Sequence, residues 1–322
     1  MIYRLLDIAW DVADQYEMLK ISWIEWYWLL QYKIRERPVR KDLKDLVRYV
    51  LRYEPSRYDA AILHVDRECL DPAAWTCGRG AIYEEMNDLI SDIPKIVMLH
   101  GTPGQVKYPS RYSAPGRILD RVRDIAGDKC VVVESRQAAQ EWGCGVPVTH
   151  HLDPAEWFDL PKQPRVLIPR IRGRYSSERD LTFASLVNEE LRSRDIVCCW
   201  IGETYSPVDW NDYRQILGRS LIYLDLAEDS SSPRARAEAM FSGCCLLCFP
   251  THDAATLLSN GINGFVIGRQ VSTIGSLVDE LLCDPRRAVE IGQRGRRLAH
   301  SVFGSNHCEA TWRNLLTQIT GK

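Results

Sequence analysis

The sequence predicts an α/β protein of two domains with parallel sheets, the second of them clearly doubly wound, on the strength of its length, its apolar pattern and a cluster of prolines. At 322 residues the chain is about twice the usual size of one domain. Short apolar runs alternate with longer amphipathic stretches, which is typical of strands and helices around parallel sheets. Pro154, Pro161 and Pro164 interrupt any regular element between the two halves and favour a linker there.

The apolar runs place the expected strands. In the first half these runs are 60–65, 95–99 and 130–133, and in the second half 166–169, 197–202, 221–226, 244–249 and 265–267. The intervals of the second half suit helices at 177–194, 209–217, 233–242, 254–258, 272–282 and 285–300. The first 58 residues show no clear pattern. We therefore expect domains at 1–153 and 165–303, a linker at 154–164, and a helix at 304–322 that can cross back to the first domain.

Composition and charge exclude several classes of protein. Hydrophobic residues make up 45% of the chain and charged residues 26%, which excludes an intrinsically disordered chain. No apolar run approaches the roughly 18 residues of a membrane span, and acidic residues near the N-terminus do not fit a secretory signal. Lys and Arg total 41 against 43 for Asp and Glu, so bulk charge disfavours nucleic acid as a partner. We expect a cytoplasmic protein.

The 11 cysteines lie mostly within apolar runs, which is typical of reduced cysteine in the cytosol. Cys245 and Cys248 form a C-x-x-C pair, but no second pair or histidine cluster stands at zinc spacing. A metal or redox site at this pair is therefore the less favoured hypothesis. The chain also contains no Asp-x-Asp, so the sequence predicts no paired-carboxylate metal site.

The segment 231–268 carries the strongest functional signal. Ser231 and Ser232 precede a proline, as at a helix N-terminus, where backbone N–H groups favour a phosphate. Glu238 follows on the same helix, where its carboxylate can accept two sugar hydroxyls. Glycines then end the helix and form a tight turn before the next strand. The alternative is that Glu238 is a solvated helix residue and the glycines are ordinary turn residues.

This segment resembles the C-terminal signature of glycosyltransferase family 4. The shared order is Glu238-Ala-Met-x-x-Gly243, a strand, an Asp-containing turn and Asn263-Gly264-Phe265, and the likeness continues at 166–180, 197–203 and 217–233. Those enzymes have the GT-B fold, in which two Rossmann-like domains face each other across the active-site cleft. The resemblance implies a retaining glycosyltransferase that moves a sugar from a nucleotide diphosphate-sugar donor to an acceptor hydroxyl, in glycan or polysaccharide synthesis.

The resemblance also implies donor-binding residues in the second half. Glu238 would bind the ribose, and the helix start at Ser231 and Ser232 would hold the diphosphate. Further donor contacts fall on Arg234, Gly202 and Glu203. The family's other acidic residue, near the transferred sugar, falls on Ser230, so the neighbouring Asp229 or Glu228 is expected to take its place, and Asp229 is counted among the catalytic residues.

The leaving diphosphate needs positive charge beside it. Arg170 or Arg172 matches the family's phosphate-binding arginine, while the lysine that follows it in the family is absent here. Arg174 or Arg179 can replace the charge of that lysine. These arginines and the helix N–H groups would balance the phosphate with no metal or other cofactor, and the phosphate itself would take the acceptor proton.

His100 is the candidate sugar-binding residue of the first half. It follows the apolar run 95–99, where a side chain can project toward a ligand. A lone histidine after a strand is often structural, but the resembling family has a sugar-contacting histidine after this strand, so we expect His100 to contact the transferred sugar. Glu134 and Ser135 follow the next strand and match a serine-before-helix position of the family, which we interpret as architectural.

Three further hypotheses concern the activity and the partners of the protein. A catalytically inactive GT-B scaffold is favoured by Ser230 and the missing lysine and disfavoured by the intact Glu238 helix. Glycosylation of a nucleic-acid base is disfavoured by the chain's charge. Residues 23–52 combine aromatic and basic side chains, which can dock peripherally on the inner face of an anionic membrane. The alternative for 23–52 is a core segment followed by a solvated helix.

Overall fold

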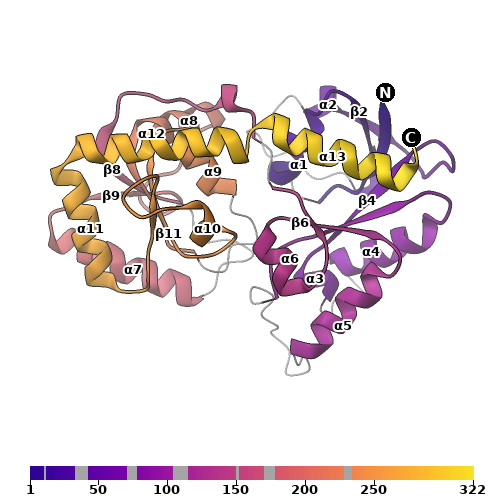
Figure 1. The fold of residues 1–322 in the computed structure, drawn as a ribbon, viewed down its shortest axis with the longest axis horizontal. Coiled ribbons are helices and arrows are strands. Elements are labelled where there is room, and N and C mark those ends of the chain that lie inside the picture. The colour runs from indigo at the N-terminus through magenta and orange to yellow at the C-terminus, as the bar shows by residue number, and fades with distance from the viewer. Residues whose placement is uncertain are drawn as a thin grey trace. The chain divides into compact units, whose positions relative to one another are not determined.

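The computed structural model describes residues 1–10, 12–32, 43–70, 78–103, 115–149, 152–169, 178–227 and 234–322. The chain divides into two compact units (Figure 1). Unit 1 comprises Met1–His151 and Asn306–Lys322, and unit 2 comprises Leu152–Ser305. Each unit is built on one parallel sheet with helices on both faces.

Unit 1 contains a sheet of seven parallel strands in the order β3-β2-β1-β4-β5-β6-β7. The strands are β1 (Tyr3–Asp7), β2 (Ile24–Leu29), β3 (Val47–Val50), β4 (Ala60–Val65), β5 (Lys95–Leu99), β6 (Cys130–Val133) and β7 (Val146–Pro147). The sequence predicts β4, β5 and β6 with the observed bounds, whereas β1, β2 and β3 fall in the part without a clear pattern. Because the strands are parallel, their carboxyl ends share one edge of the sheet.

Helices cover both faces of the unit 1 sheet. One face packs on α3 (Arg67–Leu70), α4 (Gly78–Leu89), α5 (Pro115–Ala126) and α6 (Arg136–Trp142). The other face packs on α1 (Val12–Leu19) and on the C-terminal helix α13 (Ser305–Thr320). The short elements η1 (Leu30–Tyr32) and α2 (Leu43–Leu46) complete the described part of the unit. Trp312 of α13 is fully buried beside Trp26 and Trp28, so this helix belongs to the core of unit 1.

Strand β2 buries the aromatic side chains that the membrane hypothesis for 23–52 needs. Trp26, Tyr27 and Trp28 are 1%, 3% and 1% exposed, because β2 lies between β1 and β3 and is covered on both faces. These three side chains are not available to a membrane, and for them the core alternative holds. The basic residues 33–42 lie outside the described residues. Within the described helices, none is long and apolar enough to span a bilayer.

Unit 2 contains a sheet of five parallel strands in the order β12-β11-β10-β8-β9. The strands are β8 (Gln163–Ile168), β9 (Cys198–Trp200), β10 (Ser220–Asp225), β11 (Cys245–Cys248) and β12 (Phe265–Val266). The helices are α7 (Glu178–Ser193), α8 (Trp210–Arg219), α9 (Arg234–Phe241), α10 (Ala254–Leu257), α11 (Val271–Cys283) and α12 (Pro285–Val302), with a short η3 (Pro154–Glu156) at the start. Every strand and helix expected in this half is present, with bounds that shift by a few residues.

The C-x-x-C pair lies inside strand β11. Cys245 and Cys248 are both fully buried, and burial raises the pKa of the Cys245 thiol to about 12 and that of Cys248 to about 11. Both thiols are therefore protonated and unreactive at neutral pH. Among the described residues no group of three or more His, Cys, Asp or Glu side chains is arranged to hold a metal ion.

Helix α7 ends in a Schellman motif whose left-handed residue is an aspartate. Asp195 has a φ of 60°, its N–H donates to Arg192 O at 3.0 Å, and Ile196 N–H donates to Leu191 O at 2.9 Å. A non-glycine residue in this region costs on the order of 1 kcal/mol. Because Asp195 is exposed, we expect Asp195→Gly to raise the free energy of unfolding by about 0.5–1 kcal/mol in urea denaturation. Asp195→Ala is the matched control and should not stabilise; equal stabilities of the two variants would contradict this account.

Candidate active site

Each sheet reverses its strand order at one position, and buried polar side chains lie at that position. In unit 1 the order reverses between β1 and β4, and in unit 2 between β8 and β10. Ligands of doubly wound folds bind beyond the carboxyl ends of the strands at such a reversal. Asp7 ends β1 and Asp225 ends β10, so each reversal point carries a buried carboxylate.

In unit 2 the central residue is Glu238, on the helix that follows β10. Its side chain is buried and accepts hydrogen bonds from Arg234 Nε to Oε1 and from Tyr213 OH to Oε2, both at 2.8 Å. The alternative that Glu238 is a solvated helix residue is therefore wrong. Burial raises the pKa of Tyr213 well above its ordinary value, and the Glu238 charge adds to this shift, so the phenol stays protonated and donates. Each carboxylate oxygen keeps a second lone pair for another hydroxyl.

A buried ion pair between Arg236 and Asp225 joins α9 to the end of β10. Arg236 Nε lies 2.6 Å from Asp225 Oδ2, and its Nη1 donates to Thr251 O, after β11, at 2.8 Å. The other carboxylate oxygen, Asp225 Oδ1, accepts from Ala227 N–H at 3.1 Å. This pair therefore fixes three chain segments at the carboxyl edge of the sheet, including both flanks of 228–233.

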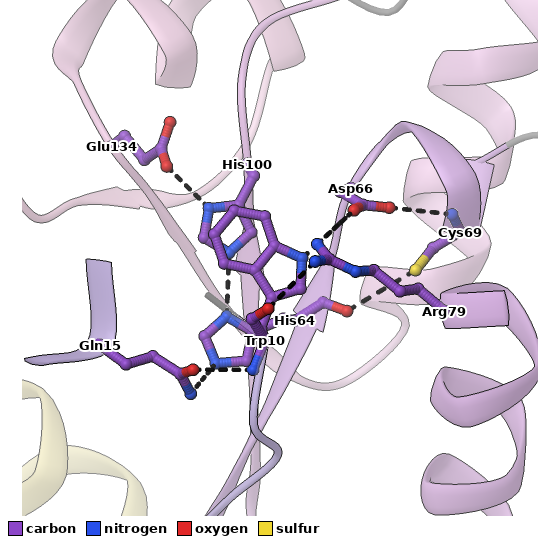
Figure 2. A network of polar contacts seen from close by, with 8 residues as sticks. All are labelled: Trp10, Gln15, His64, Asp66, Cys69, Arg79, His100 and Glu134. Atoms are coloured by element: carbon purple, nitrogen blue, oxygen red, sulfur yellow. Dashed lines mark hydrogen bonds and ion pairs between the residues drawn. The ribbon is translucent and has the colours of Figure 1, made fainter. Parts of the chain in front are cut away.

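In unit 1, four carboxyl and imidazole groups form a continuous hydrogen-bonded chain in the order Asp7, His64, His100, Glu134. Asp7 Oδ1 lies 2.9 Å from His64 Nε2, His64 Nδ1 lies 2.9 Å from His100 Nε2, and His100 Nδ1 lies 2.7 Å from Glu134 Oε1. Figure 2 shows the two imidazoles and Glu134 in line. The four groups stand at the carboxyl ends of β1, β4, β5 and β6, which are successive neighbours in the sheet. All four are buried.

Trp10, in the segment after β1, covers the two imidazoles. Its ring stacks on His100 with centroids 3.5 Å apart and on His64 with centroids 5.5 Å apart. Its Nε1 donates to Asp66 at 3.2 Å, and Arg79 pairs with the same Asp66 oxygen at 2.9 Å. The Arg79 guanidinium lies 4.9 Å from a Trp10 ring centroid and donates to Trp10 O at 3.0 Å, so Arg79 helps to hold the indole that stacks on His100 (Figure 2).

Half of the predicted site residues fall outside the described residues, namely Arg170, Arg172, Asp229, Ser231 and Ser232. Arg234 and Glu238 adjoin each other at the start of α9. Gly202 and Glu203 are exposed in a tight turn after the edge strand β9, which β8 separates from β10. The turn lies at the same carboxyl edge of the sheet as the end of β10, two strand positions away, and its assignment to the donor stays a prediction.

The two predicted features of unit 1 differ in outcome. Ser135 caps α6 as expected, since its side chain accepts from Ala138 N–H at 2.9 Å. The architectural interpretation of Glu134 is incomplete, because its carboxylate bonds His100 and also accepts from Gly101 N–H at 3.1 Å. Both ring nitrogens of His100 bond protein side chains, so a direct hydrogen bond from this ring to a sugar requires one of these bonds to open.

Comparison with known proteins identifies the fold. No protein-family model and no curated protein matches the chain. Among solved structures, HepE from Anabaena in complex with UDP-glucose matches with a TM-score of 0.66 at 12% identity, over 98% of this chain and 100% of that chain. Sucrose-phosphate synthase from Thermosynechococcus elongatus matches with a TM-score of 0.68 at 11% identity, over 99% of both chains. The chain has the GT-B fold.

The GT-B fold confirms the predicted fold class, with its two Rossmann-like domains in the seven-stranded and five-stranded units. A third match, S. aureus TarM in complex with UDP, has a TM-score of 0.60 at 12% identity and covers 80% of this chain and 56% of that chain. HepE and sucrose-phosphate synthase therefore match over both units. Identities this low establish the fold alone, since one fold hosts many functions and the residues of the site decide among them.

Proposed function

We propose that the chain is a glycosyltransferase that takes its sugar from a UDP-sugar donor. The observation that carries the proposal is the buried Glu238 carboxylate, held by Arg234 and Tyr213 on the helix that follows the central strand of a GT-B unit. Support comes from similar structures that were solved with UDP and with UDP-glucose. UDP-glucose is accordingly the donor to test first.

In the proposed reaction Glu238 accepts the ribose hydroxyls through the lone pairs that Arg234 and Tyr213 leave open. The diphosphate is assigned to Arg170 or Arg172 and to the helix start at Ser231 and Ser232. As the glycosidic bond breaks, negative charge grows on the leaving phosphate, and positive groups placed there stabilise the transition state more than the bound donor. The phosphate then takes the proton of the acceptor hydroxyl on the same face of the sugar, which retains the anomeric configuration.

The transferred sugar is assigned to Asp229 and His100. For His100 this contact requires a hydroxyl to replace Glu134 or His64 at one ring nitrogen, and a hydroxyl can do so because it both donates and accepts. Arg236 and Asp225 act indirectly, because they hold Ala227 and Thr251 beside α9 and do not themselves contact the donor in this proposal.

Removal of the Glu238 carboxylate is expected to weaken UDP-glucose binding by about 1–3 kcal/mol, since it deletes a charged acceptor from buried hydroxyl partners. Isothermal titration calorimetry with UDP and UDP-glucose measures the loss in Glu238→Ala, and thermal denaturation establishes that the variant is folded. Tyr213→Phe keeps the carboxylate and should lose less affinity. Glu189→Ala, an exposed position on α7, is the control for removal of a charge and should bind like the wild type.

Release of UDP from bound UDP-glucose separates an enzyme from the inactive scaffold that is its alternative. A wild-type protein that binds the donor but releases no UDP, with water or with sugar acceptors, would support the scaffold. A folded Glu238→Ala variant with unchanged affinity would overturn the donor-site assignment.

A further inference from the structure

The hydrogen-bonded chain of unit 1 needs more protons than two neutral imidazoles and two ionised carboxylates carry. Three hydrogen bonds connect Asp7, His64, His100 and Glu134, and each needs one proton between its two heavy atoms. Two neutral imidazoles carry one proton each, and an ionised carboxylate carries none. The four groups must therefore hold one proton beyond that complement. Without it, one of the three contacts, at 2.7 to 2.9 Å, would bring two lone pairs face to face.

The other contacts of the two carboxylates place this extra proton on the imidazoles. Asp7 Oδ2 accepts from Gln15 Nε2 at 2.5 Å and from Trp28 Nε1 at 3.0 Å, in addition to the contact of Oδ1 with His64. Gln15 is oriented for this donation because its Oε1 accepts from Trp10 N–H, and its second N–H donates to Ile8 O at 3.2 Å. Gln15 Nε2 also lies 3.2 Å from His64 Nε2, but both of its protons are directed to oxygen, so the proton of the shorter His64–Asp7 contact belongs to His64. Glu134 likewise accepts from Gly101 N–H. Hydrogen bonds donated to a carboxylate favour its ionised form, so both acids are best described as ionised.

The surroundings also favour a positive charge on the imidazole pair. One ionised carboxylate bonds each end of the pair, and the indole of Trp10 stacks on it, offering the negative face of a π system. Of the described charged residues, Asp66 and Arg79 contact Trp10, and because they pair with each other they contribute little net charge. With one added proton the four groups carry a net charge of about −1, instead of −2 in a buried site.

We propose that His64 and His100 share one extra proton at neutral pH, and that His64 is a positioning residue for His100. The shared proton connects Asp7 to Glu134 and so fixes the plane of the His100 ring under Trp10. Through Glu134 it also fixes Gly101, at the carboxyl end of β5. This deepens the proposed function and rests on it only for the role of His100 toward the sugar; the proton count rests on the geometry of unit 1 alone.

The direct test is 15N NMR of histidine-labelled full-length protein at pH 7.5. The chain has seven histidines, and His64→Gln and His100→Gln assign the two signals of interest. We expect protons on three of the four ring nitrogens of the pair, with the central proton held between His64 Nδ1 and His100 Nε2. In His64→Gln, His100 should be neutral, with one protonated ring nitrogen. Two protonated nitrogens out of four in the wild type would overturn the proposal, and thermal denaturation establishes that the two variants used for assignment are folded.

The kinetic test is the pH profile of kcat/KM with UDP-glucose. Wild-type kcat/KM should fall at alkaline pH as the shared proton leaves, and His64→Gln should lower kcat by about 10-fold and abolish that fall, as for other groups that orient an active residue. His307→Gln, an exposed site on α13, is the control and should keep the wild-type profile. A His64→Gln enzyme with the wild-type alkaline fall would contradict the positioning role. Absence of any UDP-glucose activity would count against the proposed function, while the NMR result would still decide the shared proton.

Discussion

Gly292→Ala is expected to lower the free energy of unfolding of unit 2 by about 3 kcal/mol or more, although alanine is the better helix former. Gly292 lies on α12 where this helix crosses the start of β11. A Cβ added there would stand 2.3 Å from Gly243 O and 3.0 Å from the carbonyl carbon of Cys244. Both atoms belong to the backbone and cannot rotate away, so the helix itself has to move. Because α12 also packs on α9, the displacement should weaken UDP-glucose binding as well.

Gly275→Ala is the matched control for this variant. Gly275 is also a buried helical glycine of unit 2, but its added Cβ would meet the side chains of Glu190 and Arg194, at 2.7 and 2.9 Å. These side chains are long enough to shift, and alanine gains about 1 kcal/mol of helix propensity, so the net change should stay within about 1 kcal/mol. Thermal and urea denaturation of both variants give the comparison. Similar losses of stability in the two variants would show that contact of the added Cβ with the backbone is not the cause of the loss at Gly292.

The sequence is informative where burial leaves a local pattern. β4, β5 and β6 are interior strands whose apolar runs stand out against polar flanks, and their bounds agree with the structure. β2 has an equally buried pattern, but its side chains are aromatic, and aromatic residues beside a basic stretch are also typical of a membrane surface. The distinction depends on β1 and β3 pairing with β2, which no local pattern shows.

The residues of the candidate site also differ in whether a local sequence pattern predicts them. Glu238 was predictable because its helix, glycines and following strand form one ordered segment. Tyr213 was not, because it reaches Glu238 from α8, 25 residues earlier, through packing of two helices on one face of the sheet. Asp7 and His64 meet only because β1 and β4 are neighbours in the sheet. One signal was present in the sequence: Asp225 ends a clear apolar run, and residues after strands are where function is expected.

Arg236→Met is expected to cost about 3–5 kcal/mol of stability, because it leaves Asp225 as a buried carboxylate without its cation. Methionine fills much of the same volume, so packing loss is a minor part of the effect. The measurement is urea denaturation of the single variants Arg236→Met and Asp225→Leu and of the double variant. Removal of both charges should recover most of the stability, as is found when buried ion pairs are replaced by apolar residues.

Donor affinity should not recover with stability in the double variant. Arg236 donates to Thr251 O and Asp225 accepts from Ala227 N–H, and both bonds are lost however well the apolar replacements pack. These bonds hold the two segments that flank α9 and Glu238, so the stable double variant should still bind UDP-glucose about 10-fold more weakly or worse. Arg194→Met, which breaks a half-exposed pair with Glu190 on α7, is the control and should change both quantities little. A double variant that regains full donor affinity would show that the ion pair serves stability alone; one that stays as unstable as Arg236→Met would show that the cost lies in packing rather than in an unpaired buried charge.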